Sequence, residues 1–215
     1  MVLRVSRGLL SPFLYFRVFL GPSFTAWHGR PRFFYCMFSR LRSEDKKWIM
    51  NLSMIMNCIS NAVNKMTEPI VGKTMLAQKR ELQDLLKKEF EANLSPCSAD
   101  VEHLLALEIE GDGNRDKCDV YAATSKYQII VELDATRADQ VAKKMLSRYY
   151  YANKAVDGKP TIYICLLYPG TESMNPAECV KYMDMGKEIL LAMNPANRFI
   201  GGFLKDRTVE WKNIG

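Results

Sequence analysis

The chain has 215 residues, of which 48% are hydrophobic and 25% charged, a composition that excludes a fibrous, low-complexity or wholly disordered protein. Its six cysteines form no CxxC or CxxxC pair, and its only two histidines are His28 and His103, which argues against a structural zinc site and a disulfide-stapled domain. Arginines interrupt the most apolar stretch, so no uncharged run reaches the roughly 18 residues that a membrane span needs.

The net charge of +6 belongs to the N-terminal third of the chain. Residues 1–65 hold ten of the 30 basic residues and two of the 24 acidic residues, which leaves +8 there and −2 in residues 66–215. The overall basic charge therefore says little about the partners of the folded domain.

Residues 1–43 contain seven arginines and no acidic residue, a composition typical of an organelle-targeting segment. Two other interpretations stay open: a basic tail, and upstream sequence read into the frame with the true start at Met66. We therefore expect residues 1–65 to be a basic, poorly ordered leader or a non-native extension, and residues 66–215 to form the folded domain. Residues 46–65 favour a methionine-rich amphipathic helix with a packing role only. The expected location is the cytoplasm, or an organelle if residues 1–43 are a transit segment.

From residue 73 onward, hydrophobic periodicity predicts an α/β domain with a mixed central sheet flanked by helices. The predicted elements are, in chain order, a helix at 74–92, strands at 104–109, 118–124 and 127–134, a helix at 136–153, a strand at 161–168, a helix at 176–193, and terminal strands at 198–204 and 208–211. The second and third strands form a hairpin, and the continuous apolar run 129–131 indicates a central strand buried on both faces.

Two carboxylates separated by one residue, Glu132 and Asp134, end the strand predicted at 127–134. Because side chains alternate along a strand, both lie on one side of it, and the hairpin brings Asp119 beside them. Three converging carboxylates are the hard oxygen ligands that Mg²⁺ prefers. The alternative is that the pair marks a strand leaving the core, with Asp134 capping the following helix.

Residues 115–151 resemble the core of the PD-(D/E)xK nuclease superfamily, which has the restriction-endonuclease-like fold. Asp119 matches the first acidic position of that motif, Glu132 matches the second, and residues 148–150 (RYY) match the end of the following helix. The chain departs from the motif at its third position, where Asp134 stands in place of lysine, and Met145 stands where several branches have glutamine. Lysines that could supply the missing charge from elsewhere are Lys126, Lys143 and Lys144.

The resemblance implies a restriction-endonuclease-like core and a Mg²⁺- or Mn²⁺-dependent nuclease that hydrolyses phosphodiester bonds, with DNA the first substrate to expect. Asp119, Glu132 and Asp134 would be the catalytic and metal-binding residues. The basic residues of the following helix would contact the nucleic acid; they are Arg137, Lys143, Lys144 and Arg148. The departure at Asp134 keeps an alternative open, in which the same scaffold is catalytically inactive and acts as a binding or assembly module. A homodimer is a further expectation.

Overall fold

The computed structural model describes residues 43–70, 75–105, 117–136, 138–155, 159–169 and 176–214. The chain divides into two compact units, Met1–Lys46 and Lys47–Gly215, and the fold described below is that of the second unit. The expected targeting segment, residues 1–43, lies outside the described residues except for Ser43.

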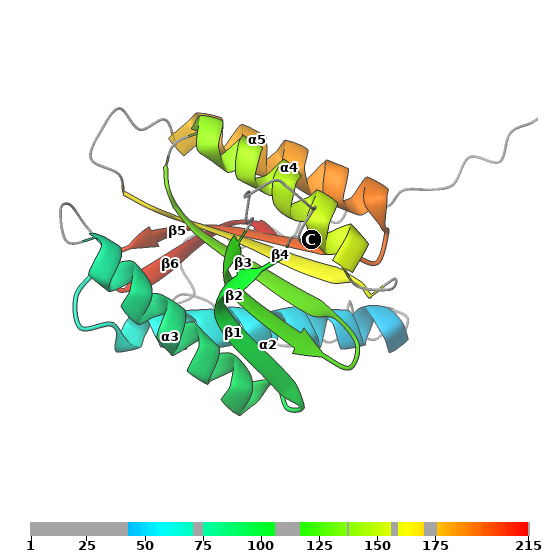
Figure 1. The fold of residues 1–215 in the computed structure, drawn as a ribbon, viewed down its shortest axis with the longest axis horizontal. Helices are drawn as coiled ribbons and strands as arrows, with labels where there is room; N and C mark the ends of the chain where they lie inside the picture. Colours follow the sequence, from blue (N-terminus) through cyan, green and yellow to red (C-terminus); the bar gives the residue numbers. More distant parts are fainter. Residues whose placement is uncertain are drawn as a thin grey trace, which may run out of the picture. The chain divides into compact units, whose positions relative to one another are not determined.

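Four helices and six strands make up the described fold (Figure 1). They are α2 (Ser43–Lys65), α3 (Met75–Asn93), β1 (Cys97–Leu104), β2 (Lys117–Thr124), β3 (Gln128–Ala135), α4 (Ala138–Ala155), β4 (Thr161–Tyr168), α5 (Pro176–Met193), β5 (Arg198–Lys205) and β6 (Thr208–Ile214). From α3 onward the order agrees with the predicted one, so the α/β class is confirmed, and the order is consistent with a restriction-endonuclease-like core.

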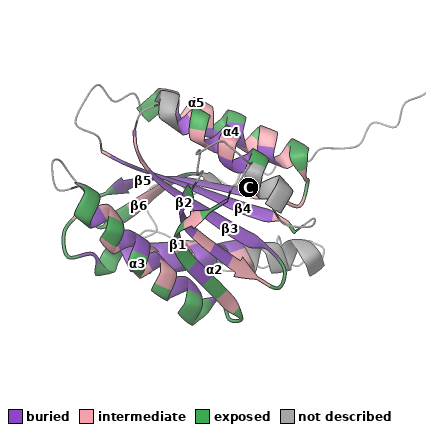
Figure 2. Ribbon diagram, in the orientation of Figure 1, coloured by how far each residue is buried: buried purple, intermediate pink, exposed green. Residues whose placement is uncertain are grey.

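The six strands form one mixed sheet in sequence order, β1 to β6. The central strands β3, β4 and β5 are parallel to one another, and the remaining neighbours are antiparallel. Helices α4 and α5 cover one face of the sheet, and α2 and α3 cover the other (Figure 1). The layers explain why β3 and β4 are almost wholly buried, as their strong hydrophobic runs predicted (Figure 2).

The alternation of side chains along β3 sorts its residues between two hydrophobic clusters. Ile129, Val131 and Leu133 belong to the cluster that includes α2 and α3. Ile130 belongs to the cluster that includes α4 and α5. Glu132 and Asp134 have the same parity as Ile130, and their ion-pair partners lie on α4. The predicted common side of these two carboxylates is therefore the α4 face.

The first described strand is β1, Cys97–Leu104, in a segment where no strand was predicted before Leu104. The strand predicted at 104–109 falls mainly on residues 106–109, which lie outside the described residues. Strand β1 is an edge of the sheet, and its burial alternates, with Ala99 its only fully packed residue. Since only one of its eight residues is buried, its composition resembles that of a loop. The more apolar run after it therefore attracted the prediction.

Helix α2 contributes to the core of the domain. Ile55, Ile59 and Ala62 have no exposed surface and belong to the same cluster as α3 and the sheet. The compact unit that contains the sheet accordingly begins at Lys47, whereas composition placed the start of the folded domain at residue 66. Composition set residues 1–65 apart because the apolar stripe of α2 follows directly on basic residues.

Candidate functional site

The three predicted site carboxylates lie on adjacent strands. Asp119 is on β2, and Glu132 and Asp134 are on β3. Asp119 and Glu132 are buried, with 6% and 2% of their surface exposed, and the Asp134 side chain is 15% exposed. The hairpin thus brings together the residues that sequence reasoning placed together.

The side chain of Asp119 adds a hydrogen bond between β2 and β3 beyond the last pair of residues on the two strands. The paired residues of the two strands run from Ala123 opposite Gln128 to Val120 opposite Val131. One residue further on, Oδ2 of Asp119 accepts a hydrogen bond of 2.6 Å from the backbone N–H of Leu133. This charge-assisted bond holds the Asp119 carboxylate over β3.

The other oxygen of Asp119 is bound by helix α3. Its Oδ1 lies 2.7 Å from Nζ of Lys79 and accepts a hydrogen bond of 3.0 Å from Nε2 of Gln83. Lys79 and Gln83 are four residues apart, so they share one face of the helix. Sequence reasoning missed both residues. Their only signal was a pair of polar side chains at helical spacing, which solvent-facing residues produce as well.

A fourth carboxylate, Glu102 of β1, joins this arrangement. Its Oε1 accepts a hydrogen bond of 2.8 Å from Nε2 of Gln83, so that one amide bridges Glu102 and Asp119. Glu102 has a φ of 50°, a left-handed conformation that is uncommon for residues other than glycine. The strained backbone of the edge strand therefore lies where its side chain meets α3.

Glu132 forms a buried ion pair with helix α4. Nε of Arg148 donates to Oε1 at 2.6 Å, and the two side chains are 8% and 3% exposed. Burial raises the pKa of Glu132 to about 8, and the charge of Asp119 adds to this, whereas Arg148 and Lys144 lower the pKa. The effect of Asp119 places the two carboxylates within electrostatic reach of each other.

Asp134 and Lys79 are the remaining charged side chains of the site. Nζ of Lys144 lies 2.7 Å from Oδ1 of Asp134, in a pair that is partly open to solvent. Burial disfavours the charged form of Lys79, but the charges of Asp119, Asp134 and Glu132 outweigh it and raise the pKa of this lysine. Lys79 therefore lies in the field of all three carboxylates and stays protonated.

The predicted basic residues have different surroundings. Lys144 and Arg148 bind carboxylates of the site, so their charges are used within the fold. Lys143 is exposed, and Arg137 lies outside the described residues. Among the lysines considered as substitutes for the motif lysine, Lys144 reaches Asp134, and Lys126 is exposed at the hairpin.

The carboxylates do not fit a resident divalent ion in this arrangement. Within the described part of the chain, no group of three His, Cys, Asp or Glu side chains is placed to hold a metal. Asp119, Glu132 and Asp134 each bind a basic side chain with at least one oxygen. Each of the three carboxylates therefore has a basic side chain of the protein itself as a partner.

Two comparisons with known proteins find no match: no protein-family model and no curated protein matches the chain. A solved structure that matches is SfsA of Pyrococcus furiosus, in complex with Ca²⁺; it is 19% identical, the match covers 62% of each chain, and the TM-score is 0.28. Among the described helices, none is long and apolar enough to cross a membrane.

Proposed function

We propose that this chain is a catalytically inactive scaffold with a restriction-endonuclease-like core, and that it acts as a binding or assembly module. The observation that carries the proposal is the cation bound to each predicted metal ligand: Lys79 on Asp119, Arg148 on Glu132 and Lys144 on Asp134. An inactive scaffold needs such compensation, because buried carboxylates without a metal or a basic partner are costly.

The aspartate at position 134, where the motif has lysine, supports the same proposal. An aspartate at that position adds negative charge beside Glu132 and removes an ammonium group. Lys144 and Lys79 restore the balance from two different helices. A divalent ion would have to displace these lysines from the carboxylate oxygens.

A second candidate is a Mg²⁺- or Mn²⁺-dependent nuclease acting on DNA. It is favoured by the proximity of Asp119 and Glu132, two buried carboxylates whose repulsion a cation would relieve. Mg²⁺ often uses only one or two carboxylates and completes its shell with water and phosphate. In this candidate Asp119, Glu132 and Asp134 are the ligands, and Lys143 is an exposed basic residue of α4 that could contact the nucleic acid.

Plasmid cleavage separates the two candidates. The full-length chain is incubated with supercoiled plasmid and Mg²⁺ or Mn²⁺, beside Asp119→Asn, Glu132→Gln and a control, Asp84→Asn, at an exposed position of α3. The scaffold proposal expects no cleavage by any of them. Cleavage by the native chain and by Asp84→Asn that both site variants lose would establish the nuclease instead. Cleavage that survives in both site variants comes from a contaminant or another site.

Metal binding offers a test that does not depend on activity. A ligand that binds only the folded state raises the midpoint of thermal unfolding. We expect Mn²⁺ to leave the midpoint unchanged, both in the native chain and in Lys79→Met, where a competing ammonium is gone. A rise that Asp119→Asn abolishes would show that the carboxylates bind the ion.

Light scattering of the same samples tests the expected homodimer.

A further inference from the structure

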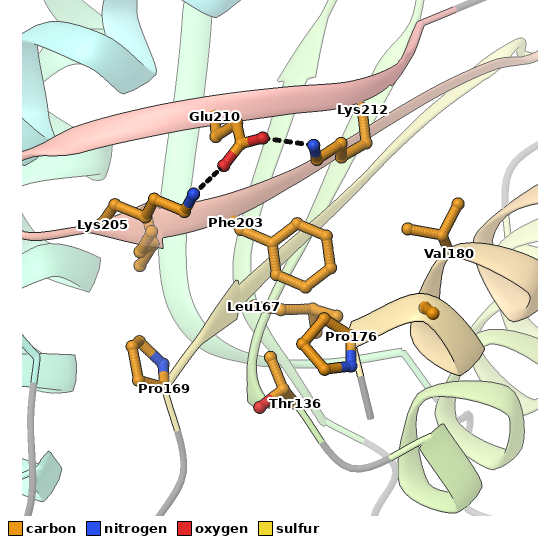
Figure 3. Close-up of a pocket in the computed structure, with 11 residues that line it drawn as sticks. Thr136, Leu167, Pro169, Pro176, Val180, Phe203, Lys205, Glu210 and Lys212 are labelled. Atoms are coloured by element: carbon orange, nitrogen blue, oxygen red, sulfur yellow. Dashed lines mark hydrogen bonds and ion pairs between the residues drawn. The ribbon is translucent and has the colours of Figure 1, made fainter. Parts of the chain in front are cut away.

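A cavity of about 380 Å³ lies beside the carboxylate site (Figure 3). Its lining residues are Thr136, Leu167, Pro169, Pro176, Ala177, Val180, Phe203, Leu204, Lys205, Glu210 and Lys212. None of the three site carboxylates lines it, although Leu167 is paired with Asp134 across β3 and β4. The cavity is therefore a neighbour of the carboxylate site and distinct from it.

The cavity lies where three parallel strands end. Thr136 directly follows β3, Pro169 directly follows β4, and Lys205 is the last residue of β5. Open α/β sheets bind ligands outside the carboxyl ends of their parallel strands. The first residue of α5, Pro176, is also at the wall, so the 18-residue helix turns its N-terminal end toward the same space. The partial positive charge of that end favours an anion.

Positive charge is in excess on the strand side of the cavity. Lys205 and Lys212 both bind the carboxylate of Glu210, one on each oxygen, as the dashed lines in Figure 3 show. Hydrogen bonds from Lys205 and Lys212 lower the pKa of Glu210 to about 2, so it is ionised at neutral pH. Two ammonium groups thus face one carboxylate, and one positive charge remains for a ligand.

The rest of the wall is apolar. Leu167 and Phe203 come from the sheet, and Pro176 and Val180 come from α5 (Figure 3). At the edge of this wall, Oγ1 of the buried Thr136 has no hydrogen-bond partner in the described structure. Rotation about its Cα–Cβ bond would turn the hydroxyl group toward the cavity and supply a polar contact.

We propose that this cavity binds a small organic anion, with its carboxylate at Lys205 and Lys212 and its apolar body against Leu167, Phe203 and Val180. The volume agrees with pockets for small molecules, which combine apolar walls with a few placed polar groups. The proposal goes beyond the scaffold function and does not depend on the carboxylate site.

Calorimetry and ligand-detected NMR on the full chain test the proposal with hexanoate, benzoate and phenylacetate as probes, each paired with its neutral amide. We expect the carboxylates to bind more tightly than the amides. The double variant Lys205→Gln/Lys212→Gln should weaken them about tenfold, as expected for a lost charged hydrogen bond. Val180→Trp should abolish binding by filling the cavity. Lys181→Gln, at an exposed position of α5, is the matched control and should bind normally.

Glu210→Gln should change the affinity for the carboxylate probes in the opposite direction. It removes the carboxylate that competes for both lysines, so the carboxylate probes should bind several-fold more tightly to this variant than to the native chain. The proposal is overturned if no probe binds, if the amides bind as well as the carboxylates, or if Val180→Trp binds as the native chain does. Inorganic phosphate that binds as tightly as the organic probes would overturn the role of the apolar wall. Thermal unfolding of each variant without probe confirms that it is folded.

Discussion

Nζ of Lys79 lies 2.7 Å from Oδ1 of Asp119, and this ion pair links helix α3 to strand β2. The lysine side chain is 18% exposed and the aspartate side chain 8%. The same aspartate was predicted to hold a metal ion, and in the structure a protein cation is bound to it.

Replacement of Lys79 by methionine should destabilise the fold. Asp119 keeps its bonds to Gln83 and Leu133 but loses its cation. We expect a loss of about 2–3 kcal/mol in the free energy of unfolding, somewhat below the cost of breaking a fully buried pair. Urea denaturation measures it. Lys143→Met, the same change at an exposed position of α4, should be close to neutral. Equal effects of both changes would contradict a special role for Lys79.

The buried Glu132 should make stability depend on pH. Its pKa is about 8 in the fold against an ordinary 4.5, because burial and the charge of Asp119 disfavour its ionised form. Between these two values the folded state keeps a proton that the unfolded chain has released, so stability falls as pH rises through this window.

Glu132→Gln removes this titration. Its free energy of unfolding should change less between about pH 5 and pH 8 than that of the native chain, and the two should approach each other at acid pH. Urea denaturation at a series of pH values compares them. Parallel pH profiles would show that Arg148 keeps Glu132 ionised throughout.

Restoring the motif lysine should cost stability, because Asp134→Lys places two ammonium groups together. Lys144 lies 2.7 Å from Asp134 in the native chain, in a pair with side chains 30% and 15% exposed. Since solvent screens this pair, we expect a loss of about 1 kcal/mol. The reversed pair Asp134→Lys/Lys144→Asp should recover most of it in a double-mutant cycle. No recovery would mean that the two residues do not interact in solution.

The hydroxyl group of Tyr149 should be dispensable. This residue is 1% exposed, its ring packs edge-to-face on Tyr163, and its hydroxyl has no hydrogen-bond partner in the described structure. Tyr149→Phe should raise the free energy of unfolding by about 1 kcal/mol, because a buried unpaired polar group is removed. Tyr121→Phe is the control and should lower the free energy of unfolding, since the Tyr121 hydroxyl donates a hydrogen bond to Gln128. A destabilised Tyr149→Phe would reveal a missing partner.

Helix α2 should be required for folding. A chain that begins at Met66 lacks the fully buried side chains of Ile55 and Ile59 and leaves their cluster open. We expect it to lose cooperative unfolding, followed by circular dichroism, whereas a chain that begins at Ser43 keeps it. Ile59→Ala in the full chain should cost about 2–5 kcal/mol. Cooperative unfolding of the shorter chain would place the domain boundary at residue 66 after all.

Local patterns were sufficient for much of the fold. The apolar runs of β3 and β4 and the helical spacing in α3, α4 and α5 predicted these elements within a few residues. The two-residue period of a strand also placed Glu132 and Asp134 on one side, and the short hairpin brought Asp119 near them. Each of these features depends on neighbours within a few residues, which periodicity reports directly.

The sequence by itself determined the α/β class, the order from α3 onward and the gathering of three carboxylates at one hairpin. Tertiary structure alone decided what those carboxylates bind. Lys79 reaches Asp119 across 40 positions of the chain, and α2 enters the core despite its basic surroundings. Long-range contacts of this kind come from the packing of helices on the sheet and leave no periodic trace in the sequence. The same packing places a basic side chain beside each of the three predicted metal ligands.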